Sequence, residues 1–209
     1  MIAALSSLLG ALIAAGVFAC AAFLGIELSV ALGARVLRDE ESPEPRRPAM
    51  RVLLVAAGIL GAIASFGGAD WQTLLLGAVV CVSLAGCWHG SLAYGTMSDA
   101  FTLIPLGAVL ISSLVEREWI LALDAAVPFV PFAIIAFASK GRGLGWDDAK
   151  LAALAGALLG IQTSMLVLAS ASLGMVLVAV GRNRKRESVA FGPYMIGAIG
   201  LALVWRLRP

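Results

Sequence analysis

Long apolar runs, separated by short polar segments, are the feature that most constrains this sequence. Of the 209 residues, 61% are hydrophobic and only 13% are charged. Soluble domains carry about a quarter charged residues, so a water-soluble enzyme and a disordered chain are both excluded. The net charge of +2 is too small to suggest a nucleic-acid partner. We therefore expect an all-α protein, a polytopic transmembrane helical bundle that has the lipid bilayer as a partner.

The apolar runs predict about eight spans, because a helix needs about 20 apolar residues to cross a bilayer. In the apolar run 149–181, residues 162–164 (Gln-Thr-Ser) are the only polar point, so we place a hairpin turn there. Residues 39–48 combine prolines with both charges and are typical of a linker. Residues 1–50 would then hold the first span and a cytoplasmic linker, and residues 51–209 the main domain. The spans are expected near 4–34, 51–67, 72–95, 101–115, 119–138, 149–164, 165–181 and 190–206.

Three basic segments predict the orientation. Residues 35–51 carry five Lys or Arg, residues 139–150 carry three and residues 182–187 carry four, so together they hold twelve of the 15 in the chain. Basic residues favour the cytoplasmic side, and eight spans put all three segments there. Both termini would then lie on the opposite side, and the segment around Asp99 would be cytoplasmic.

Acidic residues beside the predicted spans are the candidates for chemistry. Asp99 lies between the third and fourth spans, and Asp147 and Asp148 lie between the fifth and sixth, at the same predicted face. Charged groups in or beside membrane helices are costly and usually functional. Two carboxylates that share one proton can act as general base on a water and as general acid toward a carbonyl. Carboxylates that merely face water or a nearby lysine are the alternative.

The glycine-rich stretch 141–151 leads into a predicted helix. Asp147 and Asp148 both suit the first turn of that helix, where an acidic side chain can accept backbone N–H groups. A phosphate-binding loop is not expected, because no Gly-Lys-Ser/Thr follows the glycines.

Three stretches of the chain, in order, resemble the type IV prepilin peptidases, which are membrane aspartic peptidases of the Gly-x-Gly-Asp class. Residues 98–105 (SDAFTLIP) are similar to the family's Asp-x-x-Thr followed by Ile-Pro. Residues 145–151 (GWDDAKL) are similar to its Gly-x-Gly-Asp-x-Lys-Leu helix start, and residues 191–194 (FGPY) to its Phe-Gly-Pro-Tyr/Phe. The resemblance covers roughly residues 51–206.

The resemblance implies an aspartic endopeptidase that cuts the leader from type IV prepilins or pseudopilins. The active site would face the cytoplasm at the bacterial cytoplasmic (inner) membrane. The catalytic pair would be Asp99 and Asp148, since only Asp148 has the family's spacing to Lys150 and Leu151. Asp147 would cap the helix or face water, and Lys150 would tune Asp148 or extend to the interface. The residues implied to shape the site are Gly145, Asp147, Lys150, Phe191, Gly192 and Pro193.

The chain departs from the family pattern at three places. Asp147 stands where the family has the second glycine, and the first motif is one residue shorter than usual between Thr102 and Pro105. The residues 35–50 also stand where many relatives have a loop domain with paired cysteines, so N-methylation of the product is not expected.

No cofactor or metal is expected, because no His, Cys or carboxylate cluster has ligand spacing. His89, the one histidine, is predicted to be a hydrogen-bonded helix residue. Asp124 lies near the outer end of a predicted span, too far from the inner face to join Asp99 and Asp148. Two other functions remain open: a non-catalytic relative that binds or assembles pilins, and a small proton-coupled transporter.

Overall fold

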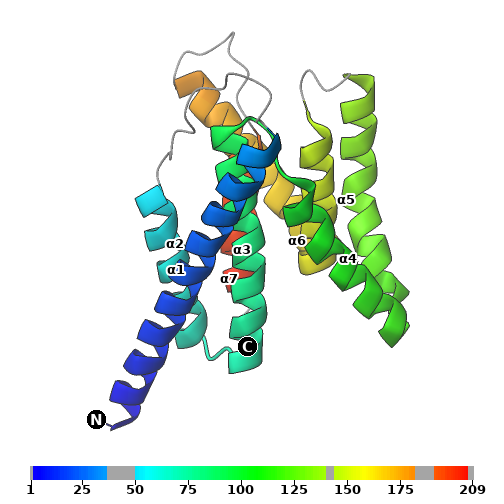
Figure 1. Ribbon diagram of the computed structural model, residues 1–209. Coiled ribbons are helices and arrows are strands. Elements are labelled where there is room, and N and C mark those ends of the chain that lie inside the picture. Colours follow the sequence, from blue (N-terminus) through cyan, green and yellow to red (C-terminus); the bar gives the residue numbers. More distant parts are fainter. Residues whose placement is uncertain (1, 37–49, 140–143, 182–190, 207–209) are drawn as a thin grey trace. The chain divides into compact units, whose positions relative to one another are not determined.

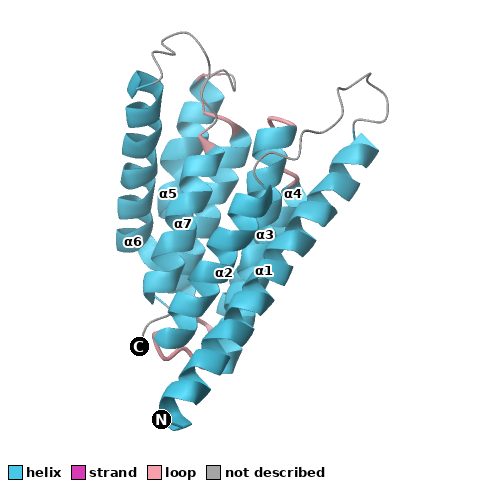
Figure 2. Ribbon diagram, turned by 90° about the vertical axis from the view of Figure 1, so that its left-hand side faces the viewer, coloured by secondary structure: helices cyan, strands magenta, loops and turns pink. Residues whose placement is uncertain are grey.

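The computed structural model describes residues 2–36, 50–139, 144–181 and 191–206, and every regular element in these ranges is a helix (Figures 1 and 2). The all-α prediction is therefore confirmed. Six predicted segments coincide with helices to within two residues at each end. The expectations for the linker 39–48 and for the basic residues 182–187 lie outside the described residues. The helices are α1 (Ile2–Val36), α2 (Met50–Phe66), α3 (Trp71–Ala93), α4 (Asp99–Glu116), α5 (Trp119–Ala138), α6 (Trp146–Gly181) and α7 (Gly192–Arg206).

Four helical stretches in the described ranges are long and apolar enough to cross a membrane. They are Ser6–Gly33, Trp71–Ala93, Trp119–Ala138 and Trp146–Val178. The prediction of about eight spans is not supported. Met50–Phe66 and Asp99–Val115 are apolar but shorter, and the predicted sixth and seventh spans fall within the single helix α6. A membrane environment accounts for these helices, because helices this long and this apolar are typical of segments that cross a lipid bilayer.

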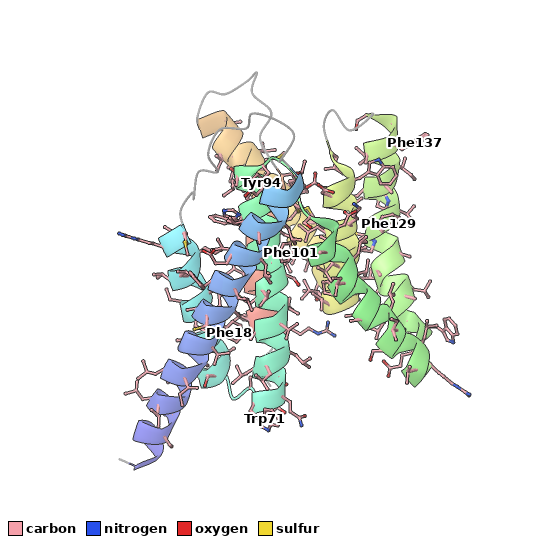
Figure 3. The ribbon with its side chains drawn as sticks, in the orientation of Figure 1. Phe18, Trp71, Tyr94, Phe101, Phe129 and Phe137 are labelled. Carbon is pink, nitrogen blue, oxygen red and sulfur yellow. The ribbon has the colours of Figure 1, made fainter. Side chains whose placement is uncertain are left out.

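Tryptophans mark three helix ends. Trp71 and Trp119 are the first residues of α3 and α5, and Trp205 lies one residue before the end of α7. All three side chains are exposed (Figure 3 shows Trp71 at its helix end). Tryptophan favours the boundary between lipid and water, so these positions fit helix ends at a membrane interface.

The chain divides into two compact units. The first comprises residues 1–101 and 203–209, and the second comprises residues 102–202. In the first unit, α1 packs against both α2 and α3 (Figures 1 and 2). Its core is made of small side chains around Phe18, including Ala22, Ala57 and Ala85. Small residues let helices approach closely, which replaces the hydrophobic driving force that lipid removes.

Asp70 starts α3. Its side chain accepts the backbone N–H of Thr73 at 3.0 Å. Hydrogen bonds from the side chain and then the backbone of Thr73 hold the pKa of Asp70 below its ordinary value. Because the folded-state pKa is lowered, the contribution of this cap is complete at neutral pH. It is lost only as the pH falls through that lowered value.

In the second unit, α5 and α6 pack side by side (Figure 1). Gly156 is the point of closest approach. A Cβ at Gly156 would overlap the carbonyl oxygen of Asp124 and lie 2.5 Å from Cγ of Pro128. The side of α6 that meets α5 therefore has room for a hydrogen atom and nothing larger.

The helix α6 is broken at Gly160. This residue has φ 76° and ψ 165°, a backbone conformation that favours glycine, and α6 changes direction there (Figure 1). Residues 162–164, where the sequence predicted the turn, are helical, so the predicted position was wrong by two residues. The break leaves the N–H of Ile161 without a helical partner, and it donates to Oδ1 of Asp124 at 3.3 Å.

Replacing Gly156 with alanine is expected to destabilise the second unit by about 1–3 kcal/mol, because the added methyl group overpacks the contact with α5. Gly197→Ala in α7 is the matched control, since a Cβ there meets nothing within 4 Å. Alanine favours a helix over glycine, so the control should be neutral or stabilising. Thermal unfolding in detergent measures both variants. Equal stability of the two would contradict the close approach at Gly156.

Candidate functional site

Asp148 lies in the first turn of α6. The helix begins at Trp146, so Gly145 is the residue just before it and Asp148 is its third residue. The N–H of Gly145 donates to Oδ2 of Asp148 at 3.0 Å. This is the N3-to-N-cap bond of a capping box, in which an acidic side chain reaches back to the chain entering the helix. The side chain is buried, with a relative exposure of 8%.

Asp147 and Lys150 form an ion pair one turn apart. Nζ of Lys150 lies 3.5 Å from Oδ1 of Asp147, and the two side chains are 23% and 28% exposed. The spacing i, i+3 puts both on one side of the helix. Lys150, expected to act on Asp148 or to extend to the interface, is thus paired with the neighbouring acid.

The structure distinguishes between the two roles expected for Asp147. Asp147 was expected to cap the helix or to face water. The side chain of Asp148 makes the capping bond, and Asp147 is partly exposed and paired with Lys150. Adjacent helical residues point about 100° apart, which explains why only one of them reaches back to Gly145.

The helix that follows Asp148 is buried almost all round. Between positions 148 and 157 every residue is buried except Lys150, which is intermediate. Most of these side chains are alanine or leucine, which allows neighbouring segments to approach from several directions. Asp148 therefore lies at the start of a largely buried stretch of α6. Burying an acidic group there costs free energy, and such groups are usually functional.

Asp99 is the first residue of α4. Its side chain is exposed, whereas Phe101 and Thr102, two and three positions later, are buried at 6% and 1% exposure. The N–H of Phe101 donates to the carbonyl oxygen of Ser98 at 3.0 Å, which forms the first turn. The stretch 98–102 therefore presents an acid outward while its apolar neighbour anchors the turn.

The third stretch, residues 191–194, starts α7. The carbonyl oxygen of Phe191 accepts the N–H groups of Tyr194 at 3.1 Å and of Met195 at 3.2 Å. Pro193, in the first turn, lacks an N–H where none is needed. The ring of Phe191 is buried and stacks on Phe132 of α5, with centroids 6.1 Å apart.

The structure brings some of the expected residues together. Gly145, Asp147, Asp148 and Lys150 meet at the start of α6. Gly192 and Pro193 follow Phe191 into α7, in the same unit as Asp148. Asp99 belongs to the other unit. Each of the three stretches begins a helix.

Two polar arrangements were not predicted from the sequence. Asp124 caps the break in α6, and Ser29 of α1 is hydrogen bonded to His89 of α3. His89 is buried at 1% exposure, so its predicted role as a hydrogen-bonded helix residue is confirmed. A glycine after an apolar run was the one signal for the break, whereas Ser29 gave none. Across the described ranges, no three His, Cys, Asp or Glu residues are grouped as a metal site.

Comparisons with known proteins give no relative. The chain matches no family model, and neither the curated proteins nor the solved structures contain a significant match.

Removing the capping bond of Asp148 should weaken the start of α6. Asp148→Ala deletes the acceptor of the Gly145 N–H and is expected to cost about 1–2 kcal/mol. Asp148→Asn retains a carbonyl oxygen at the same place and should cost less. Thermal unfolding of both variants in detergent measures the difference. If Asp148→Ala is as stable as Asp148→Asn, the bond to Gly145 does not stabilise the helix start.

Proposed function

We propose that this protein is a membrane aspartic endopeptidase that removes the leader from type IV prepilins or pseudopilins. One observation carries the proposal. The three stretches that resemble the prepilin peptidases all begin apolar helices, and two of them place an acid in the first turn. Asp99 and Asp148 are the proposed catalytic residues. Burial of Asp148 supports a chemical role, since a buried acid at a helix start is a frequent functional group.

The proposed chemistry uses the two carboxyl groups as one unit with one proton. The ionised group takes a proton from a water molecule, whose oxygen attacks the carbonyl carbon of the scissile peptide bond. The protonated group donates to the carbonyl oxygen. Collapse of the tetrahedral intermediate breaks the C–N bond, and the leaving amine takes up a proton. The proposed chemistry needs no metal ion, because the two carboxyl groups supply both the base and the acid.

The proposed topology has eight crossings, with both acids on the cytoplasmic side. Two helices, α4 and α5, lie between the start of α4 and the start of α6 in the chain. If each crosses the membrane, Asp99 and Asp148 lie at the same face. The break at Gly160 supports two crossings within residues 146–181, which also returns the basic segment 182–187 to that face.

Asp148→Asn should abolish cleavage of a prepilin-like peptide while the protein stays folded. The amide keeps the size and the acceptor of the side chain but cannot transfer a proton, and loss of a general acid or base costs at least about 10²-fold in rate. Asp99→Asn should behave alike. Asp147→Gly, which restores the glycine of the family, should retain activity. Turnover of a purified peptide substrate in detergent measures all three.

Asp124→Asn is the matched control, because Asp124 is an acid of a membrane helix outside the proposed site. Its amide oxygen can still accept the N–H of Ile161, so activity should stay close to that of the wild type. If Asp147→Asn stops turnover and Asp148→Asn does not, the register of the second motif is wrong by one residue. If the wild-type protein cleaves no prepilin-like peptide, the peptidase hypothesis is wrong, and the hypothesis of a non-catalytic pilin-binding relative takes its place.

Cysteine labelling tests the topology independently of activity. Single cysteines at positions 99 and 185, in a chain without other cysteines, should both react with an impermeant reagent from the cytoplasmic side only. The concentration of basic residues in three segments is the reason. Opposite accessibility of the two positions would exclude a shared site.

A small proton-coupled transporter is favoured by a single observation, the broken helix α6 with the carboxylate of Asp124 at the break. Interrupted helices with acidic groups form ion sites in transporters. Here the carboxylate already accepts the N–H of Ile161, which gives it a structural task. Proton-driven uptake in vesicles that is lost in Asp124→Asn, together with absence of cleavage, would favour the transporter.

A further inference from the structure

A hydrogen bond between α1 and α3 lies close to the segment that carries Asp99. Nδ1 of His89 and Oγ of Ser29 are 3.2 Å apart, and both side chains are buried, at 1% and 4% exposure. Buried polar groups that pair across two helices fix the helices in one register. His89 lies four residues before the end of α3, so the bond fixes the part of α3 from which the chain leaves for α4.

Tyr94, the first residue after α3, packs against His89 of α3 and against Gly33 of α1. The rings of His89 and Tyr94 meet edge to face, with centroids 5.9 Å apart and an angle of 76°. Gly33 of α1 lies under the tyrosine ring, so close that a Cβ there would be 2.5 Å from ring carbons. The buried hydroxyl of Tyr94 has no hydrogen-bond partner among the described residues, so packing holds the ring in place.

The connection from α3 to α4 then folds back over Gly90. A Cβ at Gly90 would lie 3.0 Å from the carbonyl oxygen of Thr96 and 3.5 Å from Oγ of Ser29. At the far end of the connection, Phe101 is buried against Gly86, where a Cβ would lie 2.6 Å from the phenylalanine ring. Tyr94 and Phe101 thus fasten the two ends of the segment 94–101 (Figure 3).

We propose that His89, anchored by Ser29, is a positioning residue that sets the place of Asp99 through the segment 94–101. Asp99 is the first residue of α4, and its side chain is exposed. Its position follows from the backbone of the first turn of α4, and that backbone is tied to α3 and α1 through Tyr94, Gly90 and Phe101. The catalytic consequence rests on the proposed function, whereas the positioning of residue 99 does not.

Small displacements at such a site have large effects on rate. Catalytic groups need to be held within about 0.5 Å of the productive geometry, and a displacement of about 1 Å can cost roughly 100-fold. A hydrogen bond of ordinary net strength changes a local equilibrium by about fivefold. Loss of the bond between His89 and Ser29 should therefore loosen residue 99 measurably without unfolding the protein.

The test measures the alkylation rate of a cysteine at position 99 in the full-length chain, with Cys20, Cys81 and Cys87 replaced by alanine. Ser29→Ala removes the hydroxyl, and His89→Phe removes the hydrogen bond while keeping a ring against Tyr94. Each should change the rate about threefold or more. The double variant should do no more than the larger single change, because both remove the same bond. Ser83→Ala, a buried serine elsewhere on α3, is the matched control and should leave the rate unchanged.

Wild-type alkylation rates in both Ser29→Ala and His89→Phe would overturn the proposal. An equal change in Ser83→Ala would also overturn it, since general loosening of α3 would then explain the effect. The kinetic counterpart, with Asp99 in place, is a fall in kcat of about tenfold in Ser29→Ala with KM within about twofold. If the wild type cleaves no peptide, the proposed function fails, and the alkylation rates still decide the positioning of residue 99.

Discussion

Backbone N–H groups at helix starts must find acceptors, and at three places in this chain a carboxylate is the acceptor. Asp70 accepts at the start of α3, Asp148 at the start of α6 and Asp124 at the break within α6. An N–H group that has no acceptor in an apolar environment costs about several kcal/mol of stability. Three acids of an otherwise apolar sequence thus lie where a helix begins or is interrupted, or accept an N–H group there.

Between these starts, the helices are held by close approach rather than by large side chains. Phe18 fits against Gly61 of α2, where a Cβ would lie 2.8 Å from the ring, and α5 meets α6 at Gly156. Because lipid is as apolar as leucine, burying leucine adds little, whereas backbone contact gains dispersion energy that lipid cannot supply. Glycines therefore lie at close contacts of α1 with α2 and of α5 with α6, whereas capping acids lie at the starts of α3 and α6.

The sequence predicted the helices well and their connections less well, for a physical reason. The two ends of an apolar run are visible in the sequence itself. Both ends of α5 were therefore predicted without error. The break in α6 depends on the backbone of Gly160, and the polar residues after it gave a misleading signal. Contacts distant in sequence, such as Asp124 with Ile161 and Ser29 with His89, follow from packing and leave no local pattern. The pair Asp147–Lys150, in contrast, has the helical spacing i, i+3 and was available from the sequence.

The extra acid at position 147 is the feature of the candidate site that most needs a physical account. A second carboxylate beside Asp148 adds unfavourable charge at a buried helix start, yet the positive end of the helix dipole and the ammonium group of Lys150 both offset it. Adjacent helical residues point about 100° apart, so this ion pair and the bond between Gly145 and Asp148 involve different sides of the helix. That bond uses one carboxylate oxygen, Oδ2, and a carboxylate has a second oxygen with its own lone pairs. Capping therefore orients Asp148 through Oδ2 and leaves Oδ1 outside that bond. The same side chain can begin the helix and still offer an oxygen for proton transfer.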